Sequence, residues 1–165
     1  MLEIREMRKR DIPEKAIVHA RTWQETYAGM LPDELNARIT PQLAERLAHE
    51  QADWLTTLVA LWDGHIVGYA SFSTACRRFE RAGETELCNL YVLRSHQGLG
   101  VGRALVDAVR GRIDERDLVL TVFAGNKRAQ GFYQHIGFRL TGRVFHDGET
   151  GDELEMLLAQ SPARA

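Results

Sequence analysis

The sequence predicts an α/β (α+β) domain with a mixed, mostly antiparallel central sheet of about seven strands and about four flanking helices. Two pairs of β-rich segments are each joined by a hairpin turn signal, at Asp63-Gly64 and at Asp147-Gly148. A third segment, residues 86–102, begins as an apolar strand and ends as a glycine-rich loop in front of a helical repeat.

The first elements follow from alternation and capping. Residues 2–7 alternate apolar and charged side chains, which predicts a strand. A helix is expected next, because Asp11 is a good N-cap residue and Pro13 is tolerated in a first helical turn. Apolar positions at helical spacing extend this helix to Tyr27, and a second helix is expected over residues 40–51.

The middle and the end of the chain are mostly strands. Residues 56–62 and 65–73 form the first hairpin, and the polar segment 74–85 follows it. This segment is either a loop over the substrate or a solvated connection, and we favour the solvated connection. The remaining apolar runs and repeats predict strands at 118–123, 138–145 and 153–158 and a helix at 126–136.

Length and composition indicate one domain over residues 1–160 and a disordered tail over 161–165. A formal net charge of -2 gives no reason to expect a nucleic acid or an anionic membrane as partner. The sequence has no apolar run of membrane-spanning length and no signal-peptide pattern, so we expect a cytoplasmic protein. Cys76 and Cys88 lack metal-ligand spacing and the six histidines are scattered, so no metal is expected.

The glycine-rich loop is the strongest chemical signal. Behind it, Val101, Leu105 and Val109 recur at helical spacing, so the loop leads into a helix N-terminus. The first amides of a helix have no internal partner, and the helix dipole adds positive charge there. Because glycine lets the backbone approach a bulky anion, Gly98, Gly100 and Gly102 favour a pyrophosphate on the backbone amides of roughly residues 98–103.

Two common phosphate loops do not fit the sequence. In a dinucleotide fingerprint starting at Gly98, the third glycine is replaced by Arg103. A P-loop requires a Lys followed by Ser or Thr after its last glycine, and Arg103-Ala104 stands there instead. The pattern that remains is Gln97-x-x-Gly100-x-Gly102, which resembles the acetyl-CoA signature of the GCN5-related N-acetyltransferase (GNAT) family. Alone, the pattern also fits a surface loop whose glycines only cap and turn.

A second motif gives the resemblance its context. The stretch from Asn126 to Phe138 reads Asn-x-x-Ala-x-x-Phe-Tyr-x-x-x-Gly-Phe and is similar to the second cofactor motif of the same family. It predicts a helix with Asn126 as N-cap and Gly137 as a left-handed end. An amphipathic helix with aromatic core residues is the alternative for this stretch by itself. Both motifs in this order identify the chain as a member of the GNAT family.

The resemblance implies an acyl-CoA N-acyltransferase fold with acetyl-CoA as co-substrate. It implies that backbone amides of the strand at residues 86–92 bind the thioester carbonyl and the pantetheine arm, where attack on a thioester develops an oxyanion. It further implies that Asn126 contacts the pantetheine or positions a water. The implied cofactor residues are Leu90, Tyr91, Val92, Gln97, Gly98, Leu99, Gly100, Val101, Gly102, Arg103, Asn126 and Tyr133, with Arg128 as a further candidate for the phosphates.

Two residues are the catalytic candidates. An alkylamine is protonated at neutral pH and must lose a proton before it attacks, and Glu86 is the candidate general base. Tyr133 matches the general acid of the family, which protonates the departing sulphur. The alternatives are a surface or ion-paired glutamate at position 86 and a buried core phenol at position 133.

The acceptor site follows only from the resemblance, which implies that the first two helices form part of its wall. Trp23, Glu25 and Tyr27 are the substrate candidates, although the two aromatic rings equally fit plain packing on the sheet. The expected function is acetyl transfer from acetyl-CoA to a primary amine of a small molecule by direct attack in a ternary complex. The alternatives are a peptide or protein N-terminal or lysine acetyltransferase and a non-catalytic acyl-CoA sensor. The members of the family that acetylate protein N-termini usually carry a glutamate where this chain has Thr121. This difference weakens the alternative of a peptide or protein acetyltransferase.

The quaternary structure follows from the sheet. Its exposed edges favour pairing between subunits, so the sequence is compatible with a homodimer.

Overall fold

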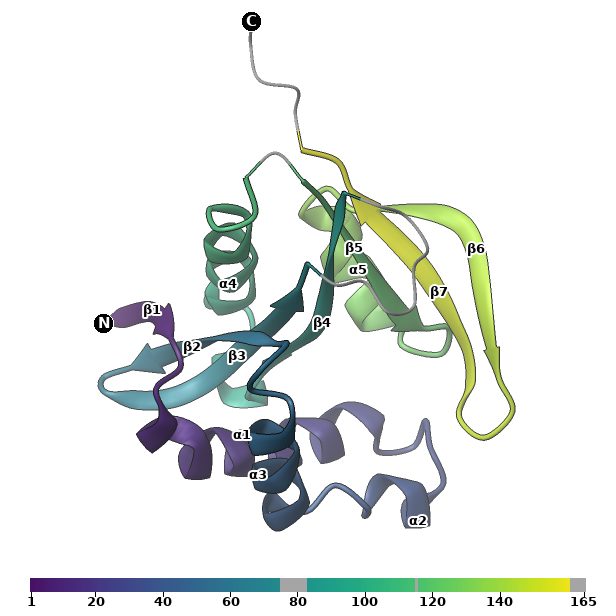
Figure 1. The fold of residues 1–165 in the computed structure, drawn as a ribbon. Helices are drawn as coiled ribbons and strands as arrows, with labels where there is room; N and C mark the ends of the chain where they lie inside the picture. Colours follow the sequence, from purple (N-terminus) through teal and green to yellow (C-terminus); the bar gives the residue numbers. More distant parts are fainter. Residues whose placement is uncertain (75–82, 115, 161–165) are drawn as a thin grey trace, which may run out of the picture. The chain divides into compact units, whose positions relative to one another are not determined.

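The computed structural model describes residues 1–74, 83–114 and 116–160 (Figure 1). It forms a sheet with strand order β1-β2-β3-β4-β5-β7-β6, in which β4 and β5 are parallel and the pairs β1–β2, β2–β3, β5–β7 and β6–β7 are antiparallel. This confirms the predicted mixed, mostly antiparallel sheet. The chain divides into two compact units, Met1–Phe72 with Asn89–Arg112 and Ser73–Cys88 with Ile113–Ala165, which are described separately below.

The observed elements match the predicted ones closely, with one addition. The strands are β1 (Leu2–Glu6), β2 (Thr56–Trp62), β3 (His65–Ser73), β4 (Glu84–Val92), β5 (Asp117–Phe123), β6 (Arg139–Asp147) and β7 (Gly151–Leu158). The helices are α1 (Ile12–Tyr27), α2 (Asp33–Asn36), α3 (Pro41–Glu50), α4 (Val101–Arg110) and α5 (Lys127–His135), with 3₁₀ turns η1 (Lys9–Asp11) and η2 (Arg94–His96). The helix α2 was not predicted, because a single turn has no periodic pattern to detect.

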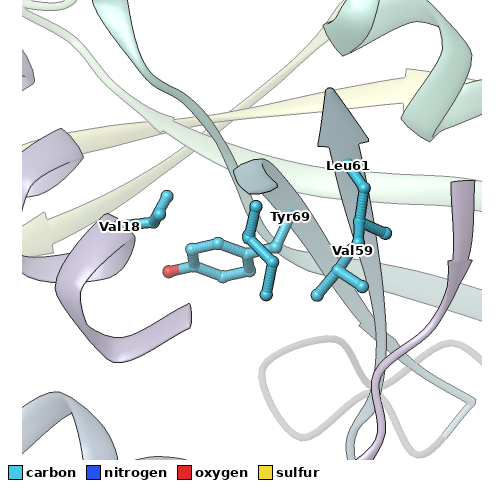
Figure 2. Packing of buried hydrophobic residues seen from close by; sticks show 5 residues of the cluster. Val18, Val59, Leu61 and Tyr69 are labelled. Carbon is cyan, nitrogen blue, oxygen red and sulfur yellow. The ribbon is translucent and has the colours of Figure 1, made fainter. Parts of the chain in front are cut away.

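In the first unit, helices cover both faces of the β1–β2–β3 meander. Val59 and Leu61 of β2 and Tyr69 of β3 pack with Val18 of α1 (Figure 2), while α4 packs against β1 and β2. Alternate residues of a strand point to opposite faces, and both faces are covered here. Nearly every residue of β2 is therefore buried, which explains its almost continuous apolar sequence.

The turn between β2 and β3 has the predicted geometry. Asp63 and Gly64 both have positive φ, 50° and 88°, as a type I′ hairpin turn requires.

The predicted capping role of Asp11 is wrong. No cap hydrogen bond to α1 comes from its side chain, although Asp11 occupies the N-cap position. One carboxylate oxygen accepts the backbone N–H of Arg8 at 2.6 Å, and the guanidinium of Arg5 in β1 donates to both oxygens at 2.6 and 3.1 Å. The ion pair and these hydrogen bonds lower the pKa of Asp11. Asp11 therefore fixes η1 to β1 instead of capping α1.

In the second unit, β5 is the interior strand. It pairs in parallel with the first residues of β4 and antiparallel with β7, and Leu118, Val119 and Leu120 are buried. Its apolar sequence follows from this position, because both faces of an interior strand are covered. The turn after α5 packs on β7, since a Cβ at Gly137 would lie 3.2 Å from Leu158 Cδ1. Residues 75–82 and 161–165, which include most of the predicted polar segment, Cys76 and the predicted tail, lie outside the described residues.

Neither a membrane span nor a metal cluster is found over the described ranges. No helix there is long and apolar enough to cross a membrane. No group of three or more His, Cys, Asp or Glu side chains is arranged to hold a metal ion in the same part of the chain.

Candidate active site

The glycine-rich loop in the first unit has the backbone that an anion site requires. Gly98 and Gly100 have φ values of 78° and 84°, which L side chains rarely adopt. Gly100 is the N-cap of α4 and has no side chain that could accept from the first helical amides. The first backbone hydrogen bond of the helix runs from Ala104 N–H to Gly100 O at 3.0 Å. The amides of Val101, Gly102 and Arg103 are therefore the helix N-terminal donors. These features fit a pyrophosphate group.

Gln97 has a structural partner that the sequence does not reveal. Its side-chain amide donates to Val92 O at 2.9 Å, and its backbone N–H donates to Arg94 O at 3.3 Å. Gln97 therefore ties the loop to the end of β4, which fixes the start of the loop relative to the strand that precedes it.

The end of β4 lies unusually close to β3. A Cβ at Gly68 would lie 2.7 Å from Tyr91 O and 3.3 Å from Val92 Cα, and Leu93 N donates to Val67 O at 2.9 Å. Gly68 is thus required by close backbone approach at the residues predicted to bind the thioester.

This approach leads to a first prediction. Gly68→Ala is expected to lower the stability of the protein by about 1–3 kcal/mol, because the added methyl group must displace a backbone oxygen. It is also expected to raise KM for acetyl-CoA by moving Tyr91 and Val92. Urea unfolding and steady-state kinetics measure the two effects, with Gly29→Ala as a strained but spatially open control. Wild-type stability and KM in Gly68→Ala would contradict the prediction.

The substrate candidates of α1 lie in an aromatic cluster with β3 and β4. The ring of Trp23 lies 4.5 Å from that of Tyr27, and the Tyr27 hydroxyl lies 3.4 Å from the hydroxyl of Tyr91. Tyr91 stacks on His19 at 6.0 Å and lies 5.8 Å from Tyr69. The structure therefore brings Trp23 and Tyr27 together with a residue of the predicted thioester strand.

Glu25 has structural partners as well. Its carboxylate accepts the backbone N–H of Arg94 at 3.0 Å and pairs with Arg21 at 3.2 Å, while its carbonyl accepts from the Arg94 guanidinium at 2.8 Å. Glu25 thus anchors the start of η2 to α1.

His19 and Tyr69 belong to the same cluster, and sequence reasoning missed both. His19 Nδ1 and the Tyr69 hydroxyl are buried without a hydrogen-bond partner among the described residues. Burial, with Lys15 nearby, lowers the pKa of His19 to about 4, and burial raises the pKa of Tyr69, so both rings are neutral at neutral pH. Helical spacing on α1 places His19 four residues before Trp23, but periodicity alone does not separate such residues from ordinary core positions.

Glu86 lies in the second unit, on β4. It is partly buried and stands opposite Val119 of β5 in the parallel ladder. Because residues directly opposite one another share a sheet face, Glu86 lies on the same face as Val119 and, two residues further on, Thr121. Thr121 in turn pairs with Glu155 of β7.

The second motif forms α5 as predicted. Asn126 is buried, and its side-chain oxygen accepts from Ala129 N at 3.0 Å, which confirms the N-cap. The side chain of Gln130 donates to the carbonyls of Phe123 and Ala124 at 3.0 and 2.9 Å, so the helix is fixed to the end of β5. Gly137 has a φ of 109°, as expected for the helix end.

Tyr133 is partly buried on this helix. Its ring lies 5.3 Å from Phe132 and 5.4 Å from Phe138, both in edge-to-face geometry. These contacts pack the ring through its carbon atoms.

Gly131 leads to a second prediction. It lies inside α5 on the exposed side, and a Cβ there would meet no atom within 4 Å. Gly131→Ala is therefore expected to stabilise the protein by about 1 kcal/mol, the difference in helix propensity. Urea unfolding checks this, with Gly137→Ala expected to destabilise because of its positive φ. A stability loss in Gly131→Ala would contradict the prediction.

The predicted residues thus fall into two groups. The loop, the end of β4 and the substrate candidates lie in the first unit, and Glu86, Asn126 and Tyr133 lie in the second. In the first unit, the glycine-rich loop before α4 and the close approach of β3 and β4 have the backbone geometry expected for the anion-binding part of an acyl-CoA transferase.

Comparisons with known proteins agree with this class. The sequence profile of the Acetyltransferase (GNAT) family matches residues 18–138. A probable N-acetyltransferase of Mycobacterium tuberculosis is 26% identical over 149 residues, which cover 87% of this chain and 83% of that protein. The 5-NmdU N-acetyltransferase of Pseudomonas phage PaMx11 is 33% identical over 84 residues, 51% of this chain and 57% of the phage protein. The PaiA N-acetyltransferase of Thermoplasma acidophilum, crystallised with coenzyme A, superposes with a TM-score of 0.76 at 20% identity, covering 96% of this chain and 99% of that one.

The chain belongs to the GNAT acetyltransferase family. It has the acyl-CoA N-acyltransferase fold, and as a member of this family it is an acyl-CoA-dependent N-acetyltransferase.

Proposed function

We propose that this enzyme acetylates a primary amine of a small molecule, with acetyl-CoA and the amine bound together and the amine attacking directly. The aromatic cluster of the first unit supports this proposal most strongly. Tyr91, whose backbone is expected at the thioester, places its side chain among Tyr27, His19 and Tyr69. Neutral rings next to the transferred group favour a compact acceptor with apolar surface. The phage relative, which is named for 5-NmdU and not for a protein acceptor, is consistent with it.

The chain's own residues have separate tasks in this proposal. The N-terminal amides of α4, with the side chain of Arg103, would hold the phosphates of acetyl-CoA. The amides of Leu90, Tyr91 and Val92 would hold the pantetheine arm and the thioester carbonyl. Acetyl-CoA supplies an activated acetyl group as a thioester. We assign these tasks within a single catalytic domain over residues 1–160.

Two proton transfers remain for the side chains of the second unit. Glu86, directly or through water, would take a proton from the ammonium group of the acceptor. Tyr133 would donate its hydroxyl proton to the departing sulphur and be reprotonated by the second proton that the attacking nitrogen loses as the amide forms. Asn126, already engaged as N-cap through its oxygen, retains its amide N–H groups for the pantetheine or a water.

Free-thiol release from acetyl-CoA tests the proposal on a panel of small amines, peptide N-termini and lysine peptides. Turnover on a small amine, with no release on peptides, is the expected result. Turnover on peptides alone would replace the small-molecule acceptor with a protein acceptor. Tight acetyl-CoA binding without turnover on any amine or peptide would favour a sensor.

A further inference from the structure

Lys15 is a buried cation in the first unit. It lies on α1, the residue is only 5% exposed, and its Nζ lies 4.2 Å from the centroid of the Tyr69 ring. Within the described ranges no carboxylate lies at ion-pair distance from Nζ, and no hydrogen bond of Nζ is found. A ring face offsets only part of the hydration that an ammonium group loses on burial.

The carboxylates next to Lys15 in the sequence are engaged elsewhere. Asp11 pairs with Arg5 at 2.6 Å. Glu14 accepts the backbone N–H of Ile66 at 3.1 Å and lies 3.4 Å from His65 Nδ1. Neither is therefore available as a counterion for Lys15.

A small cavity adjoins Lys15. It has a volume of about 20 Å³ and lies where residues of α1, α3 and β2 meet. Gln51 and Thr57 are its other polar wall residues, and apolar side chains form the rest. A space of this size holds a single water molecule or a monatomic ion.

The charge decides between these two occupants. A water molecule can accept one hydrogen bond from an ammonium group but leaves its charge uncompensated, whereas a buried charge normally requires an opposite charge. We propose that the cavity beside Lys15 binds a small monovalent anion of the size of chloride. This site is separate from acetyl transfer and does not depend on the proposed acceptor.

Lys15 carries the positive charge of the proposed site, because the titratable groups around it are neutral at pH 7. Burial lowers the pKa of Lys15 to about 8, so the side chain is still mainly a cation at pH 7. The titratable groups packed next to it, His19 of α1 and Tyr69 of β3, are neutral at that pH. Among the described residues that line the cavity, no other is ionisable. Anion binding should therefore weaken as the pH rises above about 8.

Thermal unfolding in matched salts tests the proposal. At pH 7, replacing sodium gluconate with sodium chloride at constant ionic strength is expected to raise the Tm of the wild type by about 2–4 °C. Lys15→Met, which keeps the length and apolar stem of the side chain, should show no chloride response. Lys9→Met removes an exposed lysine from the same unit and should keep the full response. Equal Tm values for the wild type in the two salts would overturn the proposal.

Two further measurements use only the wild-type protein, so they test the anion site even if the Lys15→Met variant does not fold. At pH 9.5 the chloride response of the wild type should largely disappear, and an unchanged response would place the anion elsewhere. In crystals grown with sodium bromide, an anomalous peak is expected beside Lys15 Nζ. A fully occupied water without anomalous signal at that position would contradict the anion site.

Discussion

Tyr133→Phe is expected to lower kcat for acetyl transfer by about 10²–10⁴-fold, the usual contribution of a general acid. The substitution removes one oxygen atom and leaves the ring contacts with Phe132 and Phe138, so the fold of α5 should not change. KM for acetyl-CoA should stay within about threefold, because the remaining cofactor contacts come from other residues. Free-thiol release at saturating amine measures the effect.

The control for this variant is its stability. Because edge-to-face packing depends on the ring, the Tm of Tyr133→Phe should equal that of the wild type within about 2 °C. Phe132→Leu, which removes a ring from the same helix, is expected to lower the Tm with a much smaller loss in kcat. An unchanged kcat in Tyr133→Phe would remove the general-acid role from Tyr133.

Glu86→Gln is expected to lower kcat/KM by about 10²–10⁴-fold at neutral pH, since the amide cannot accept the proton of the acceptor ammonium. Glutamine keeps the size of the side chain, so the β4–β5 ladder at Val119 should persist. The rate of the variant should rise with pH, because a larger fraction of the acceptor amine is then already deprotonated. The pH dependence of kcat/KM over the range that the protein tolerates measures this.

Glu84→Gln provides the matched control. Glu84 lies two residues earlier on β4, and hence on the same sheet face as Glu86, opposite Asp117. If Glu86 is the base, Glu84→Gln should change kcat/KM by less than about threefold. Equal losses of kcat/KM in the two variants would indicate that the negative charge of both glutamates supports the reaction. The general-base role would then not be assigned to Glu86.

The local features of this protein were predictable because they depend on a few neighbouring residues. The Asp63-Gly64 turn needs two residues that tolerate positive φ, and both have it in the structure. Asn126 is followed by a helical apolar pattern, and its oxygen caps that helix. The parallel pairing of β4 and β5 was not predicted for these two strands; the structure shows it, and the helix between them supplies the crossover that such a pair needs.

The predicted roles of several polar side chains changed or became more specific once their partners were visible. Asp11 binds Arg5 of β1 instead of capping α1, and Gln97 binds the carbonyl of Val92. Glu25 accepts the backbone N–H of Arg94, 69 residues further along the chain. A polar side chain forms the best hydrogen bond that the fold brings within reach, and residue type alone does not say which group that is.

The sequence by itself determined the order of the elements, the glycine loop and the family, because periodicity, turn chemistry and motif spacing are local properties. Only the tertiary structure decided which residues of α1 face β3 and β4. It placed Lys15 above Tyr69 and His19 beside Tyr91. These contacts join residues more than 50 positions apart in the chain, and the burial that holds His19 neutral exists only once the elements have packed together.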